Sequence, residues 1–280
     1  MGKKVAQQYE QMNQPPFYPY SPPIPAGAFP PPPQQQLLQQ QQQQQHQQHQ
    51  QQYQQYQQPA EVPRQFPTAF CMYTESRWSQ RHWMLGEHQA NPLYAVSLHS
   101  GLSGQPDVVL HSGPNEKLPP FAGAKRDGWG GAAKITFPTG LGSQETVEKM
   151  EKGGSLTHPT FSFSIEVGPG MWRETFEWRH TSGAAVKALD GQRSGWKLVR
   201  LAGGGGAGFG ATSSDGKEVV AVWAWASASL TKVFKFQFLS SGANGALGDR
   251  WAIMAVITAL KIWDRQRREK NARAASGGGA

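Results

Sequence analysis

Three segments in the second half of the chain alternate regularly between apolar and polar residues. They span 161–167, 174–180 and 234–238. Successive side chains of a strand point to opposite faces, so this period predicts strands with one buried face. The side chains expected to point inward are Phe161, Phe163, Phe176, Trp178, Phe234, Phe236 and Phe238.

Less regular strand patterns fill most of the chain from Phe66 onward. They lie at 70–74, 82–87, 93–99, 107–111, 133–137, 184–189, 196–201 and 219–226, with glycine and proline between them. Two charge-rich or glycine-rich stretches, 118–132 and 140–158, are expected to be long loops, the second with a helical turn at 144–152. About ten short strands separated by turn residues are typical of an antiparallel barrel or sandwich.

The pattern then changes to that of a helix. Asp249 is a suitable N-cap, and the residues from Trp251 to Leu260 leave no polar face. A helix that is apolar all round is buried either in a protein core or in a membrane. The thirteen residues 251–263 would span only about 20 Å, against about 30 Å of hydrocarbon. We therefore expect a mainly β domain in which this helix lies inside the curved sheet.

The first 65 residues have a different composition. Proline is the commonest residue between positions 15 and 33, and glutamine makes up most of 34–58. Neither stretch has enough apolar surface to offset the entropy lost on ordering. Residues 1–65 are therefore expected to form a disordered arm with a polyglutamine tract.

The net charge of +8 is unevenly distributed. The tail, 265–280, contributes half of it and is expected to be disordered, whereas the body between arm and tail carries only a small excess. Such a body does not favour specific nucleic-acid binding. The tail residues Arg265, Arg267, Arg268 and Lys270 fit a solvated helix end, a nuclear localisation patch or a tether to anionic membranes.

No arrangement typical of an enzyme stands out. Cys71 is the only cysteine, which excludes an intrachain disulfide, and the histidines are not at metal-ligand spacing. The obvious carboxylate pair, Glu174 and Glu177, falls on opposite faces of one strand. We expect neither a metal nor a cofactor, and a function in binding rather than catalysis.

The succession of short strands and one apolar C-terminal helix resembles the tubby C-terminal-like superfamily. That group includes tubby proteins, plant LURP-one-related proteins and phospholipid scramblases, in which a barrel encloses a helix. The resemblance covers about 66–264 and implies a closed antiparallel β-barrel, residues 66–264, wrapped around one central helix, 249–264. It rests on Asp249-Arg250-Trp251 through Trp263, on the strand from Arg81 to Gly86 and on the strand from Gly195 to Val199. The chain lacks the cysteine cluster and the acidic calcium-binding stretch of scramblases.

The resemblance implies binding of phosphoinositides or other anionic lipids by basic side chains on the barrel. Five residues are candidates by charge alone, namely Arg173, Arg179, Lys187, Arg193 and Lys197. The alternative is a solvated strand face whose cations form local ion pairs.

Pro15, Pro16 and Tyr18 form a PPxY pattern, which WW domains bind in the polyproline II conformation. The leading hypothesis is thus a cytoplasmic, peripheral membrane-binding module whose arm recruits WW-domain partners. One alternative is a scramblase-like protein with 251–263 inserted in the bilayer. Another is a nuclear co-regulator that uses the glutamine-rich arm and the basic tail.

Overall fold

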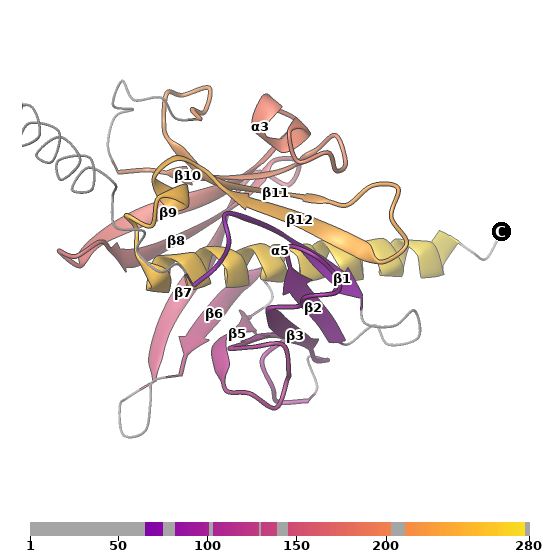
Figure 1. Ribbon diagram of the computed structural model, residues 1–280. Coiled ribbons are helices and arrows are strands. Elements are labelled where there is room, and N and C mark those ends of the chain that lie inside the picture. Colours follow the sequence, from indigo (N-terminus) through magenta and orange to yellow (C-terminus); the bar gives the residue numbers. More distant parts are fainter. Residues whose placement is uncertain are drawn as a thin grey trace, which may run out of the picture. The chain divides into compact units, whose positions relative to one another are not determined.

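A computed structural model describes residues 65–74, 82–100, 103–128, 130–138, 145–202 and 211–277. Apart from Gln65, the expected arm lies outside these residues. Twelve antiparallel strands close into a barrel (Figure 1). They are β1 (Ala69–Thr74), β2 (His82–Gly86), β3 (Tyr94–Leu98), β4 (Val108–His111), β5 (Pro120–Asp127), β6 (Ala132–Phe137), β7 (Thr146–Gly154), β8 (Pro159–Val167), β9 (Trp172–Thr181), β10 (Gly195–Arg200), β11 (Val219–Trp225) and β12 (Lys232–Phe238).

Each strand pairs with its neighbour in sequence, and the first strand pairs with the last to close the ring. At this closure Phe70 lies opposite Phe236, and their rings stack with centroids 4.9 Å apart. All seven aromatic residues expected to point inward are buried, with at most 3% of their surface exposed. The period-two pattern therefore identified the inner face of β8, β9 and β12 correctly.

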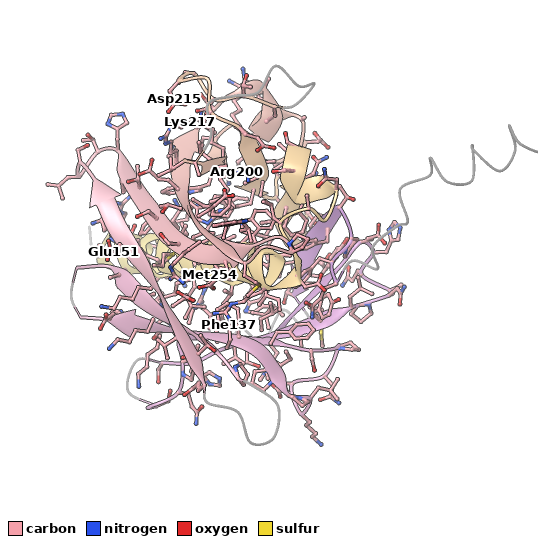
Figure 2. The ribbon with its side chains drawn as sticks, turned by 90° about the vertical axis from the view of Figure 1, so that its left-hand side faces the viewer. Phe137, Glu151, Arg200, Asp215, Lys217 and Met254 are labelled. Atoms are coloured by element: carbon pink, nitrogen blue, oxygen red, sulfur yellow. The ribbon has the colours of Figure 1, made fainter. Side chains whose placement is uncertain are left out.

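One long helix, α5 (Asp249–Gly277), runs through the barrel. Every residue from Met254 to Asp264 is buried, so strands surround this part of the helix on all sides. Figure 2, viewed from the side on which α5 begins, shows Met254 near the centre of the ring of strands. The expected barrel around a central helix is confirmed.

The helix does not end at residue 264 as expected, and 265–277 are helical rather than disordered. Arginine, lysine, glutamate and alanine all have high helix propensity. Ion pairs at helical spacing add to it, because Asp264 binds Arg268 at 2.7 Å and Arg265 binds Glu269 at 2.9 Å. The change from apolar to polar residues after Asp264 marks the end of the buried part of α5, and the helix itself continues to Gly277.

Two expected loops are strands instead. Within 118–132 lies β5, whose inward positions include Ala122 and Ala124. These small side chains let α5 pack closely against the strand, but they make the alternation faint. Within 140–158 lies β7 rather than a helical turn.

The expected strand at 184–189 is also wrong, because α3 (Ala184–Lys187) is a single helical turn. It buries Val186 against β10 and β11. A second short helix, α4 (Ser240–Ala243), precedes α5. No helix in the described part of the chain is long and apolar enough to cross a bilayer.

Candidate functional site

The helix α5 leaves the barrel at one end, which we call the mouth, and its last turns extend beyond the strands (Figure 1). Two side-chain contacts fix the place of exit. The indole N–H of Trp225, the last residue of β11, donates to Gln266 at 2.9 Å. On the opposite side, the guanidinium of Arg268 donates to the carbonyl of His99 at 2.9 Å. The emerging helix is therefore held by strand ends on both of its sides.

Just inside the mouth, charged groups of the helix are buried in pairs. Lys261 donates to the carboxylate of Asp107, which precedes β4. Asp264 is fully buried and accepts from Arg267 at 2.9 Å and from Arg268 at 2.7 Å. Two of the basic tail residues thus neutralise a buried acid and do not face solvent as free cations.

Burial tends to raise the pKa of Asp107, but the hydrogen bond and charge of Lys261 outweigh it. The backbone N–H of Arg126 also donates to this carboxylate at 2.9 Å, and the charge of Arg268 adds to the effect. The pKa of Asp107 therefore lies below its ordinary value. The carboxylate stays ionised at neutral pH and anchors the helix to the barrel wall.

Two cavities flank the helix where it emerges. The first, of about 230 Å³, lies between α5 and the edges of β5 and β6 and is lined by Arg126, Gly131, Ala132, Lys261, Asp264, Arg265, Arg268 and Glu269. The second, of about 300 Å³, lies between α5 and β9 to β11 and is lined by His180, Gln192, Ser194, Gly195, Trp196, Trp225, Gln266, Glu269, Lys270 and Arg273.

The second cavity combines cations with aromatic rings. The ammonium of Lys270 lies 3.8 Å from the centroid of the Trp225 ring, a cation–π contact. Burial lowers the pKa of Lys270. Trp196 is buried, and its indole N–H has no hydrogen-bond partner among the described residues. Burial and the charge of His158 lower the pKa of His180. The cavity thus offers several donors and little negative charge.

Two of the five candidate lipid-binding residues lie in the connection between β9 and β10, whose residues Gln192 and Ser194 line this second cavity. Lys187 is in α3, Arg193 follows the turn, and both are exposed. The connection is tied to the mouth because the backbone N–H of Gln192 donates to the carbonyl of Trp225 at 2.8 Å. The fold therefore brings Lys187 and Arg193 to the same end as the basic part of α5.

Arg179 and Lys197 lie opposite each other on the outer faces of β9 and β10. Arg179 binds Glu177 at 2.6 Å and Asp215 at 2.7 Å, and Lys197 donates to Ser213 at 2.6 Å. The hydrogen bond from Arg179 is the largest cause that lowers the pKa of Asp215 to about 2. The charge of Arg179 is therefore matched within the domain, whereas half-buried Lys197 is hydrogen-bonded to a neutral hydroxyl.

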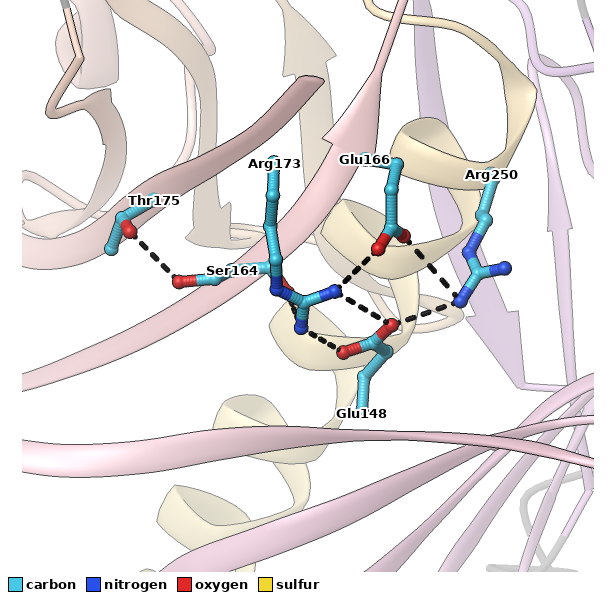
Figure 3. A network of polar contacts seen from close by, with 6 residues as sticks. All are labelled: Glu148, Ser164, Glu166, Arg173, Thr175 and Arg250. Atoms are coloured by element: carbon cyan, nitrogen blue, oxygen red, sulfur yellow. Dashed lines mark hydrogen bonds and ion pairs between the residues drawn. The ribbon is translucent and has the colours of Figure 1, made fainter. Parts of the chain in front are cut away.

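Arg173 lies near the opposite end of the barrel, in a cluster that Figure 3 shows. Pairing between β7 and β8 stops at Met150, and Glu148 lies beyond that point. Arg173 binds both Glu148 and Glu166, the latter at 2.6 Å, while Arg250 of α5 binds Glu148 at 2.9 Å. These ion pairs join β7, β8 and β9 to α5 where the β7–β8 ladder has ended.

We expect these paired carboxylates to make the fold sensitive to acid. Burial raises the pKa of Glu166, but hydrogen bonds and the charges of Arg173 and Arg250 lower it overall, as for Asp107. A carboxylate whose pKa is lower in the folded than in the unfolded state stabilises the fold at pH values above its unfolded pKa of about 4. This stabilisation is lost as the pH falls further, toward the folded-state pKa. The melting temperature should therefore drop steadily below about pH 4. The Glu166→Gln variant should show a shallower drop, and an unchanged slope would contradict this explanation.

The residues that complete the candidate site were not identifiable from the sequence. Trp196, Trp225, Gln192 and Gln266 come from separate elements and carry no shared motif. The carboxylates Glu174 and Glu177 are bound by different arginines, Arg200 at 2.6 Å and Arg179 at 2.6 Å. The PPxY residues Pro15, Pro16 and Tyr18 lie outside the described residues.

The chain matches no protein-family model, no curated protein and no solved structure. Its function therefore has to be inferred from the side chains at the mouth and from the physical chemistry of their surroundings.

Proposed function

We propose that this chain is a non-enzymatic module, similar to tubby C-terminal-like proteins, that binds anionic phospholipid surfaces, phosphoinositides included, through the mouth. The observation that carries the proposal is a set of exposed cations at this end of the barrel. Lys187, Arg193, Lys270 and Arg273 form no ion pair with any described residue. We call these four residues the free cations.

The contrast with the other basic candidates supports this choice. Arg173 and Arg179 each bind two carboxylates, so binding a lipid phosphate would break existing ion pairs. The free cations would break no ion pair on binding a phosphate, although Lys270 would give up part of its contact with Trp225. A basic residue near an anionic membrane contributes about 1 kcal/mol, and the attraction decays within a Debye length of about 8–10 Å. Several such residues at one end orient the domain as well as attract it.

The scramblase-like alternative requires residues 251–263 to enter the bilayer. In the barrel, these residues are the core around which the strands close. Withdrawing them would expose the inner aromatic faces of the strands, which favours peripheral binding. The PPxY arm would then bring WW-domain partners to a cytoplasmic membrane surface.

The test is co-sedimentation with vesicles of phosphatidylcholine alone or mixed with phosphatidylserine or a phosphoinositide. The double variant Lys270→Gln/Arg273→Gln should bind anionic vesicles roughly 30-fold more weakly, the equivalent of about 2 kcal/mol. The matched control Lys117→Gln/Lys149→Gln removes the same charge elsewhere, and its binding should be close to that of the unchanged chain. Added salt should weaken binding.

Neutralising all four free cations should abolish most of the remaining affinity. Equal losses in the two double variants would mean that net charge alone attracts the protein. Binding that is unaffected by all of these changes would refute the proposal.

A further inference from the structure

Two leucines stand out because their side chains are almost completely exposed. Leu156 is 95% exposed and Leu230 is 79% exposed, the highest values among the large apolar side chains of the described residues. Leu156 lies at the tip of the β7–β8 hairpin and Leu230 at the tip of the β11–β12 hairpin. An exposed leucine costs free energy in water that burial in an apolar phase would recover.

Both hairpin tips lie at the mouth, beside the basic part of α5. The β11–β12 hairpin begins after Trp225, which contacts Gln266 and Lys270. Lys152, two residues before the end of β7, lies with the Arg265 guanidinium beside Gly131. Both apolar tips therefore lie at the end of the barrel from which α5 emerges with Lys270 and Arg273.

Short-range hydrogen bonds hold each tip in a defined shape. In the first, the backbone N–H of Ser155 donates to the carbonyl of His158 at 3.2 Å, and the N–H of His158 donates to the Ser155 hydroxyl at 3.0 Å. In the second, the N–H of Lys232 donates to the Ser229 hydroxyl at 2.9 Å. Pre-formed tips lose little entropy when they enter another phase.

Basic residues accompany both leucines in the hairpins themselves. Lys152 is in the strand that leads to Leu156, and Lys232 is two residues after Leu230. A protein-binding surface is usually built around a central, well-packed cluster of anchors. Two separate apolar tips surrounded by cations fit a lipid bilayer better, because its interior is apolar and its surface can be anionic.

We propose that the domain docks mouth-first on an anionic bilayer, with Leu156 and Leu230 inserted below the headgroups and the free cations at headgroup level. The proposal rests on the proposed function and adds to it the orientation and the depth of the domain. The opposite end supplies the contrast. The exposed Trp172, at 75%, is followed there by Arg173, whose charge is already matched by Glu148 and Glu166.

The first measurement is binding of the full chain to vesicles of phosphatidylcholine and phosphatidylserine. Leu156→Ser/Leu230→Ser should reduce affinity by roughly 100-fold, about tenfold for each leucine, and leave the residual binding sensitive to salt. The control Trp172→Ser removes a larger exposed apolar side chain at the opposite end and should bind like the unchanged chain. Melting temperatures of all variants should agree, because none of these side chains is buried.

The second measurement reports depth. With Cys71→Ser as background, an environment-sensitive fluorophore is attached to Leu156→Cys or, separately, to Trp172→Cys. On anionic vesicles the label at 156 should shift to the blue and be quenched by brominated acyl chains, whereas the label at 172 should remain in water.

The outcomes separate the two proposals. If the unchanged chain does not bind anionic vesicles, the proposed function fails and the docking orientation fails with it. If it binds while the double serine variant binds equally well, or while the label at 156 stays in water, only the inserted tips are refuted. If the unchanged chain dimerises in solution and the serine variant does not, the tips are an interface between two copies, which also overturns the proposal.

Discussion

Replacing Ile257 with aspartate is expected to unfold the whole barrel. Ile257 is fully buried near the middle of the enclosed part of α5, with strands on every side. An ionised carboxylate at this position would be buried without a partner, at a cost of several kcal/mol. Domains of this kind are stable by only about 5–15 kcal/mol in total. Circular dichroism and urea titration should show loss of the native fold or a large decrease in the unfolding midpoint.

Two controls assign the effect to burial of the charge. Ile257→Val removes one methyl group and should cost only about 0.5–1.5 kcal/mol. Ala274→Asp puts the same charge on the exposed end of the same helix and should leave stability within about 0.5 kcal/mol of the unchanged chain. An Ile257→Asp protein as stable as the Ala274→Asp protein would contradict the central position of the helix.

The second large effect is expected at Lys261. Lys261→Met keeps the apolar stem but leaves the buried carboxylate of Asp107 without its closest cation. Breaking one member of a buried ion pair typically costs about 3–5 kcal/mol, because the remaining charge stays desolvated. The free energy of unfolding, measured in urea, should decrease by about that amount.

The double variant Lys261→Met/Asp107→Leu serves as the control, since it removes both charges together. Replacing a buried pair with apolar residues is often close to neutral, so the double variant should be more stable than the single one. If the double variant is no more stable than Lys261→Met, the loss does not come from an unpaired Asp107.

The less regular patterns in the sequence correctly predicted β1 to β4, β6, β10 and β11. The strands with the clearest pattern share one property, a row of large apolar residues at alternate positions. This holds for β8, β9 and β12, whose inner phenylalanines and tryptophan fill the space beside the helix. The strand β5 was missed because its inward positions 122 and 124, which pack beside α5, hold small alanines rather than large apolar residues. The strand β7 was missed because one of its inward residues is Glu148, which is neutralised by arginines from β9 and α5.

The candidate site was predictable only in outline. The concentration of basic residues after Asp264 was clear from the sequence, but the charges available for binding were not. Arg173 and Arg179 differ from Lys187 and Arg193 only in the carboxylates that the fold brings to them. Those partners lie on other strands, and no local pattern identifies them.

The enclosed helix also has a consequence for how the chain is made. The helix that fills the barrel follows all twelve strands in the sequence. The ring can close only after β12 has been synthesised, because β12 is the strand that pairs with β1. Contacts between such distant segments slow folding, and the inner faces of the strands remain open until α5 has been synthesised. During that interval the nascent chain on the ribosome exposes the apolar faces of its strands, because the helix that covers them has not yet been made. We therefore expect the nascent chain to depend on chaperones that cover apolar strands, and a message cut short before Asp249 to yield aggregated protein rather than a smaller domain.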